Sequence, residues 1–118
     1  MKKLTKTQKA NVVNALHRCK PFLAKKRKSN KETYICYAVS NGCPKSFWSL
    51  PVKEQDNIDE GVDLIVDIIM ERLAPCYNVN EWLCNNVPEY YNLTLNQQQD
   101  AAQVYRHRWV DELIREFS

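Results

Sequence analysis

The chain has 118 residues, 44% of them hydrophobic and 26% charged, with a formal net charge of +3 at pH 7. These values lie close to the averages of soluble globular proteins, so they indicate neither a disordered chain nor a membrane protein. No stretch approaches the roughly 18 apolar residues of a transmembrane helix, and polar residues follow Lys2 and Lys3 where a signal peptide would be apolar. We therefore expect one cytosolic domain, residues 1–118, around a single core.

Helix starts are marked along the chain by pairs of residues that form capping boxes. In such a pair, a Ser, Thr or Asn is followed three residues later by Glu or Gln, and each side chain accepts a hydrogen bond from the backbone N–H of the other residue. The pairs are Thr5 with Gln8, Ser29 with Glu32, Asn57 with Glu60, Asn78 with Glu81, and Thr94 with Gln97. The two glycines, Gly42 and Gly61, are too few for hairpins and phosphate-binding loops. The sequence predicts a compact all-α domain of about five helices, over residues 6–26, 30–40, 58–73, 79–86 and 95–117.

The first two helices have recognisable inward faces and ends. The expected inward residues of the first helix, 6–26, are Val12, Val13, Leu16, and either Phe22 or Leu23. Pro21 lacks a backbone N–H, so this helix must kink or restart there. The second helix, 30–40, is expected to end at Asn41 and Gly42, a pair suited to the C-terminal cap.

Residues 43–56 are predicted to form an ordered apolar loop. The segment contains two prolines and the apolar residues Phe47, Trp48, Leu50 and Val52. An exposed patch of this kind is a liability for a free monomer, so we expect a lid over the core in preference to a partner-binding loop.

The remaining helices are predicted from apolar stripes and one hydrophobic staple. The stripes are Ile58, Val62, Ile65, Ile69 and Leu73 in the third helix, and Ala102, Tyr105, Trp109, Leu113 and Phe117 in the last helix. We expect the last helix to be the central packing element. Arg106 lies near the middle of its stripe, where it is expected to pair with a carboxylate or to extend its charged end to solvent. The fourth helix, 79–86, has the most specific start, because Tyr77 and Trp82 flank Asn78 as a hydrophobic staple.

Charge divides the chain into a basic N-terminal segment and an acidic remainder. Residues 1–31 hold eleven Lys or Arg and no acid, whereas residues 32–118 hold six bases and fourteen acids, so the two regions carry +11 and −8. The basic segment is a candidate nucleic-acid-binding region, with Lys20, Lys25, Lys26, Arg27, Lys28 and Lys31 as the residues that would neutralise phosphates. A solvated basic turn, and attraction between the two regions within one fold or between chains, remain open as alternatives.

The third helix carries the second charged feature, which we call the acidic face. It consists of Asp59, Glu60, Asp63, Asp67, Met70 and Glu71, opposite the apolar stripe. Most such faces are merely solvated. Met70 is an adaptable apolar side chain among like charges, as expected of a binding surface for a basic partner. If the 43–56 loop binds a partner instead of covering the core, Phe47 and Trp48 would contribute to this surface.

Motifs of known catalytic chemistry are missing from the sequence. There is no Gly-x-Ser-x-Gly, no His-Glu-x-x-His, no phosphate loop and no pair of histidines at metal-ligand spacing. His107 and Asp111 stand four residues apart on the last helix, but the charged residues around them favour a surface ion-pair lattice. We therefore expect a non-enzymatic protein with no catalytic residues, no metal and no cofactor.

The cysteines are expected to be reduced and structural. The five thiols belong to Cys19, Cys36, Cys43, Cys76 and Cys84. An odd number leaves one without a disulfide partner, and no pair has the Cys-x-x-Cys spacing of a zinc site.

Short motifs in the second half of the chain carry a resemblance to a class of proteins. They are Glu71-Arg72-Leu73, Trp82-Leu83, Gln103-Val104-Tyr105-Arg106-His107-Arg108-Trp109 and Leu113-Ile114-Arg115-Glu116-Phe117. Over residues 71–117 the chain resembles small helical proteins of tailed bacteriophages. The resemblance implies a phage gene expressed in the host bacterial cytoplasm, where small proteins bind and disable a host enzyme or defence complex.

Two functional hypotheses follow from the charge pattern and the resemblance. The first is a phage-type inhibitor or anti-defence accessory protein that binds a host protein through the acidic face. The alternative is a nucleic-acid-binding accessory protein that uses the basic N-terminal segment. A homo-oligomer is compatible with both, and no membrane association is expected.

Overall fold

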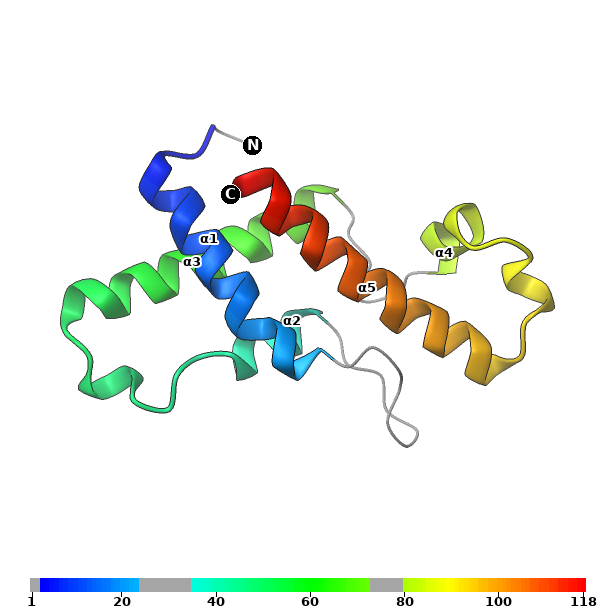
Figure 1. Ribbon diagram of the computed structural model, residues 1–118, viewed down its shortest axis with the longest axis horizontal. Helices are drawn as coiled ribbons and strands as arrows, with labels where there is room; N and C mark the ends of the chain where they lie inside the picture. Colours follow the sequence, from blue (N-terminus) through cyan, green and yellow to red (C-terminus); the bar gives the residue numbers. More distant parts are fainter. Residues whose placement is uncertain (1–2, 24–34, 73–79) are drawn as a thin grey trace.

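The computed structural model describes residues 3–23, 35–72 and 80–118, and all regular secondary structure in these ranges is helical (Figure 1). The α-helices are α1 (Lys6–Cys19), α2 (Ile35–Asn41), α3 (Val52–Arg72), α4 (Asn80–Asn86) and α5 (Leu95–Phe117). Short 3₁₀ helices are η1 (Lys20–Phe22), η2 (Phe47–Ser49) and η3 (Tyr90–Asn92). The predicted all-α class is confirmed.

Two of the predicted capping boxes start helices as expected. Thr5 Oγ1 accepts a hydrogen bond from the backbone N–H of Gln8 (3.1 Å), and Gln8 Oε1 accepts one from the N–H of Thr5 (3.0 Å). Thr94 and Gln97 make the same pair of bonds at the start of α5, at 3.2 and 3.0 Å. The capping pairs beginning at Ser29 and Asn78 lie outside the described residues.

Pro21 interrupts the first helix as predicted. Because Pro21 has no N–H to donate to the preceding turn, the α-helix ends at Cys19 and the chain continues as η1. Leu23 turns inward and is 2% exposed, whereas Phe22 is 49% exposed. The parts of the predicted first and second helices at residues 24–26 and 30–34 lie outside the described residues.

The predicted start of the third helix is wrong, because α3 begins at Val52 and includes the end of the predicted 43–56 loop. Asn57 does not cap the helix. It lies inside α3, where its side chain and that of Glu60 accept hydrogen bonds from Asn11 Nδ2, at 3.4 and 3.0 Å. The helix starts after Pro51, whose carbonyl oxygen accepts from the N–H of Gln55 (3.1 Å).

The central element is α1, which packs against α2, α3 and α5 (Figure 1). The expectation that the last helix would be central is therefore wrong. Gly61 of α3 lies against the backbone of α1, where an added Cβ would overlap the carbonyl oxygen of Asn11. Gly42 allows a similar approach, since a Cβ there would lie 2.8 Å from the carbonyl oxygen of Arg18. The two glycines thus permit close helix packing.

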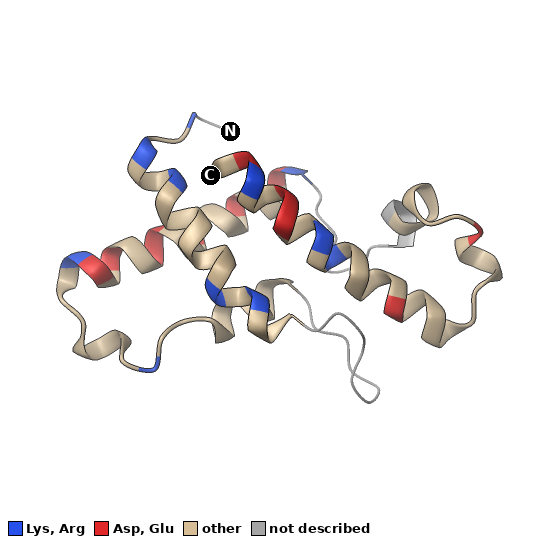
Figure 2. Cartoon of the chain, in the orientation of Figure 1, with Lys and Arg blue, Asp and Glu red and all other residues tan. Residues whose placement is uncertain are grey.

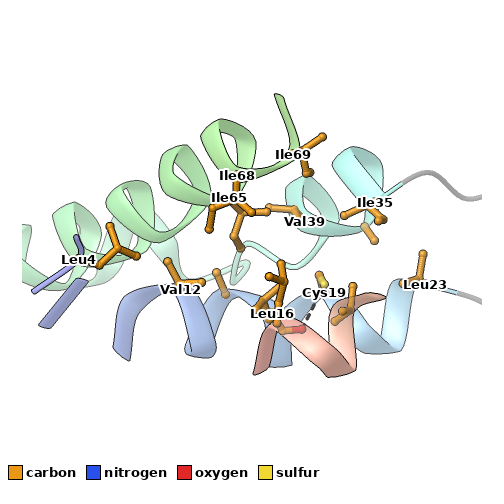
Figure 3. Packing of buried hydrophobic residues seen from close by; sticks show 14 residues of the cluster. Leu4, Val12, Leu16, Cys19, Leu23, Ile35, Val39, Ile65, Ile68 and Ile69 are labelled. Carbon is orange, nitrogen blue, oxygen red and sulfur yellow. Dashed lines mark hydrogen bonds between the residues drawn. The ribbon is translucent and has the colours of Figure 1, made fainter. Parts of the chain in front are cut away.

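Buried hydrophobic residues form a main core and a smaller cluster. The main core, drawn in Figure 3, contains Leu4, Val12, Ala15, Leu16, Cys19, Leu23, Ile35, Ala38, Val39, Ile65, Ile68, Ile69, Val110 and Leu113. The smaller cluster contains Leu83, Tyr90 and Ala102, where α4 and η3 lie beside the N-terminal half of α5. Because the second cluster lies toward one end of α5, the molecule is elongated, with extents of 50 × 32 × 19 Å.

The buried face of α5 is rotated from the predicted apolar stripe. Tyr105, Trp109 and Phe117 are only half-buried. Gln103 and Arg106 are 0% exposed, so the expectation that Arg106 extends to solvent is wrong. Its Nη1 donates to Gln103 Oε1 (2.6 Å). Burying a guanidinium is costly unless its N–H groups find hydrogen-bond acceptors, and Gln103 supplies one from the preceding turn.

Candidate functional site

The acidic face lies mostly on the outward side of α3, as predicted. Asp59, Asp63, Asp67 and Glu71 are exposed, and Met70 is 67% exposed. Glu60 departs from the prediction, because it is half-buried and its Oε1 accepts a hydrogen bond from α1. Its carboxylate therefore helps to join two helices.

A continuous row of exposed side chains runs along α3, and we call it the α3 stripe. It consists of Val52, Asp56, Asp59, Asp63, Val66 and Met70. The residues are separated alternately by four and three positions, so they lie on one narrow face that is about 27 Å long at about 1.5 Å per residue. Val52, Val66 and Met70 are 70%, 41% and 67% exposed. The stripe thus has carboxylates in its middle and apolar side chains at both ends.

The N-terminal part of this stripe, Val52 and Asp56, is not predicted by the sequence pattern. The predicted 43–56 loop includes Val52 and Asp56, because the capping pattern of Asn57 with Glu60 indicates a later helix start. The signal for the earlier start was Pro51 followed by Glu54, because proline is tolerated at a helix start and a carboxylate is favourable in the first turn.

The two aromatic residues of the 43–56 segment have different environments. Phe47 is 9% exposed, whereas Trp48 is 85% exposed, and their rings meet edge to face with centroids 5.1 Å apart. Gln55 Nε2 donates to the carbonyl oxygen of Leu50 (3.0 Å), which joins this segment to α3. Phe47 therefore anchors the segment, and Trp48 is the residue available for contact beside the N-terminal end of α3.

Lys20, the predicted phosphate-binding residue that the structure describes, is paired within the chain. Lys20 Nζ lies 2.6 Å from Asp111 Oδ1 of α5. The hydrogen bond from Lys20 lowers the pKa of the Asp111 carboxyl. The other predicted phosphate-binding residues, Lys25, Lys26, Arg27, Lys28 and Lys31, lie outside the described residues.

Basic and acidic residues alternate along the C-terminal half of α5, whereas α3 carries mainly acidic residues (Figure 2). On α5, the partners of Asp111, Glu112 and Glu116 are Lys20, Arg108 and Arg72, at 2.6, 3.1 and 2.8 Å. Of the lattice expected within α5, the Arg108–Glu112 pair is present, whereas Lys20 and Arg72 come from η1 and α3. Among the described residues, no Lys or Arg forms an ion pair with Asp59, Asp63 or Asp67. The described part of the chain therefore supplies no cationic partner for these three carboxylates of α3.

Among the thiols that the structure describes, Cys19 is the most strongly perturbed. It is 0% exposed, its Sγ–H donates to the carbonyl oxygen of Leu16 (3.1 Å), and burial raises its pKa to about 11. Such a thiol is a poor nucleophile. Across residues 3–23, 35–72 and 80–118, no three His, Cys, Asp or Glu side chains are grouped so as to hold a metal ion. In the same ranges, no helix combines the length and the apolar character needed to cross a membrane.

Comparisons with protein-family models, curated proteins and solved structures gave no match to this chain. The α3 stripe and the uncompensated carboxylates are thus the features from which a function is argued.

Proposed function

We propose that this chain is a small non-enzymatic helical protein that binds a basic protein partner through the acidic face of α3. The observation that carries the proposal is the α3 stripe, in which exposed carboxylates that pair with no described Lys or Arg lie between exposed apolar side chains. Like charges four residues apart destabilise a helix by roughly 0.2–0.5 kcal/mol per pair. Cations of a partner would relieve this repulsion, and Val66 and Met70 would add apolar contact.

The resemblance over residues 71–117 supports a host bacterial protein as that partner. On this proposal, the chain is a phage-type inhibitor or anti-defence accessory protein. Trp48 stands four residues before Val52, the first residue of the stripe, and is 85% exposed, so it is an aromatic residue that could extend the contact. Aromatic anchors are common among residues that dominate binding energy.

The test is affinity capture from bacterial lysate with the tagged chain and its Asp63→Lys/Asp67→Lys variant. Both positions are exposed, so the variant should fold like the wild type. We expect a stoichiometric host protein on the wild type and at least a roughly tenfold loss on the variant. Undiminished capture would contradict the proposal.

A matched control is Glu89→Lys/Glu112→Lys, which changes the net charge equally at exposed positions away from α3. It should retain the partner. A nuclease-treated sample addresses the alternative function, a nucleic-acid-binding accessory protein that uses the basic segment. Captured material that disappears with nuclease, and with Lys25 to Lys28 replaced by Gln, would favour that alternative.

A further inference from the structure

A polar pocket lies in the wedge between α1 and the N-terminal half of α3. The helices meet at Asn11 and Gly61 and diverge from there (Figure 1). The pocket has a volume of about 210 Å³ and is lined by Asn11, Asn14, Arg18, Glu54, Asn57 and Ile58. Sites for drug-sized ligands measure roughly 300–1,000 Å³. This pocket therefore suits a molecule of only a few heavy atoms.

Arg18 forms the cationic wall of the pocket. Its side chain is half-buried, and burial lowers the pKa of its guanidinium. In the part of the chain that the structure describes, no carboxylate forms an ion pair with Arg18, in contrast to Lys20 and Arg72. A partly desolvated guanidinium binds best to a planar anionic group such as a carboxylate.

The apex of the wedge supplies amide groups. Asn57 uses its Oδ1 to accept from Asn11, which leaves the two N–H donors of its amide for a ligand. Asn14 lines the α1 wall with a second amide. Donors from Asn57 and Arg18 are thus held on two different helices around the same space.

The α3 side of the pocket carries an acidic residue. Glu54 projects from the first turn of α3 and is exposed, and Ile58 follows one turn later. Glu54 and Arg18 line the same pocket without forming an ion pair with each other. Opposite charges therefore face one small space from two helices, which is the arrangement that a ligand with both charges would match.

We propose that this pocket binds a small zwitterion of the α-amino-acid class, with its carboxylate on Arg18 and Asn57 and its ammonium group on Glu54. Ile58 provides the apolar surface for a short side chain. This site is separate from the acidic face and does not depend on the proposed partner.

The experiment is a titration of the ¹⁵N-labelled full chain with L-alanine, followed by NMR of the side-chain amide signals of Asn14 and Asn57. We expect saturable shifts of both signals. Acetate and methylammonium, each of which carries one charge of the zwitterion, should give no saturable shift at the same concentration. Equal saturation by acetate alone would overturn the proposal and identify a simple anion site.

Substitutions inside and outside the pocket distinguish L-alanine binding at this site from an effect of charge on the whole protein. Arg18→Gln and Glu54→Gln should each weaken L-alanine binding by about tenfold, because each removes one charge-assisted contact. Arg115→Gln removes an exposed cation outside the pocket and should leave the binding unchanged. Thermal unfolding of each variant checks that the fold is intact. Absence of saturation in the wild type, or unchanged binding in both pocket variants, would contradict the proposal.

Discussion

Lys20 Nζ of η1 lies 2.6 Å from Asp111 Oδ1 of α5, so one ion pair joins the basic N-terminal segment to the acidic remainder of the same chain. His107 Nδ1 lies 3.6 Å from the other oxygen of Asp111. Attraction between the two charged regions, left open by the sequence, therefore operates within the fold at this point.

This pair predicts a loss of stability in acid. Hydrogen bonding to Lys20 lowers the pKa of Asp111, and bonding to Arg72 lowers that of Glu116. A carboxyl group whose pKa is lowered by folding stabilises the fold above its unfolded pKa, about 4, and this stability is lost as pH falls through the folded pKa. Urea unfolding should show lower stability at pH 2.5 than at pH 6.

The Lys20→Gln variant should lose less stability over this acid range. Both side chains of the pair are more than a third exposed, so solvent screening limits the difference to about 0.5 kcal/mol. Lys45→Gln changes an exposed cation of the 43–51 loop and should follow the wild-type pH profile. Identical profiles for Lys20→Gln and the wild type would show that the pair does not contribute.

Gly61→Ala should destabilise the protein although alanine is the better helix former. The added Cβ would overlap the carbonyl group of Asn11, and backbone atoms cannot move aside without separating α1 from α3. Overpacking typically costs about 1–3 kcal/mol, more than the propensity gain of about 1 kcal/mol. Urea denaturation measures the net change, and a more stable variant would refute the close crossing.

Gln103→Leu should destabilise the fold because it removes an acceptor from the buried Arg106 guanidinium. The expected loss in the free energy of unfolding is about 2 kcal/mol. Gln103→Glu keeps an acceptor oxygen at the same position and should lose less. Equal losses in the two variants would indicate that cavity shape, and not the hydrogen bond, determines the effect.

The thiols should differ in their rate of alkylation by iodoacetamide at pH 8. Cys19 is fully buried with a pKa of about 11, so little thiolate forms and the reagent cannot reach it. Of the four described thiols, that of Cys43 is exposed and should react first. Peptide mapping by mass spectrometry gives the order, with a sample unfolded in guanidinium as the control in which Cys19 reacts. Rapid modification of Cys19 in the native protein would contradict its burial.

The capping boxes show which helix starts can be predicted from the sequence alone. Thr5 with Gln8, and Thr94 with Gln97, bond to each other across a single turn, so their residue types were sufficient to locate α1 and α5. Asn57 with Glu60 has the same pattern but bonds to Asn11 on another helix. Pro51 and Glu54 are a local signal for the earlier helix start, but no local rule predicts that Asn57 and Glu60 bond to Asn11, because Asn11 is distant in the sequence.

The sequence by itself determined the helical class, the interruption at Pro21, the C-terminal helix and most of the acidic face, since these depend on hydrogen bonds and side-chain spacing within a few residues. Only the tertiary structure decided the rotation of α5 that buries Arg106, the close crossing at Gly61, and the wedge that brings Arg18 and Glu54 to one pocket. These features depend on which helix faces which. Packing complementarity between distant segments determines that choice, and periodicity within a single helix does not encode it.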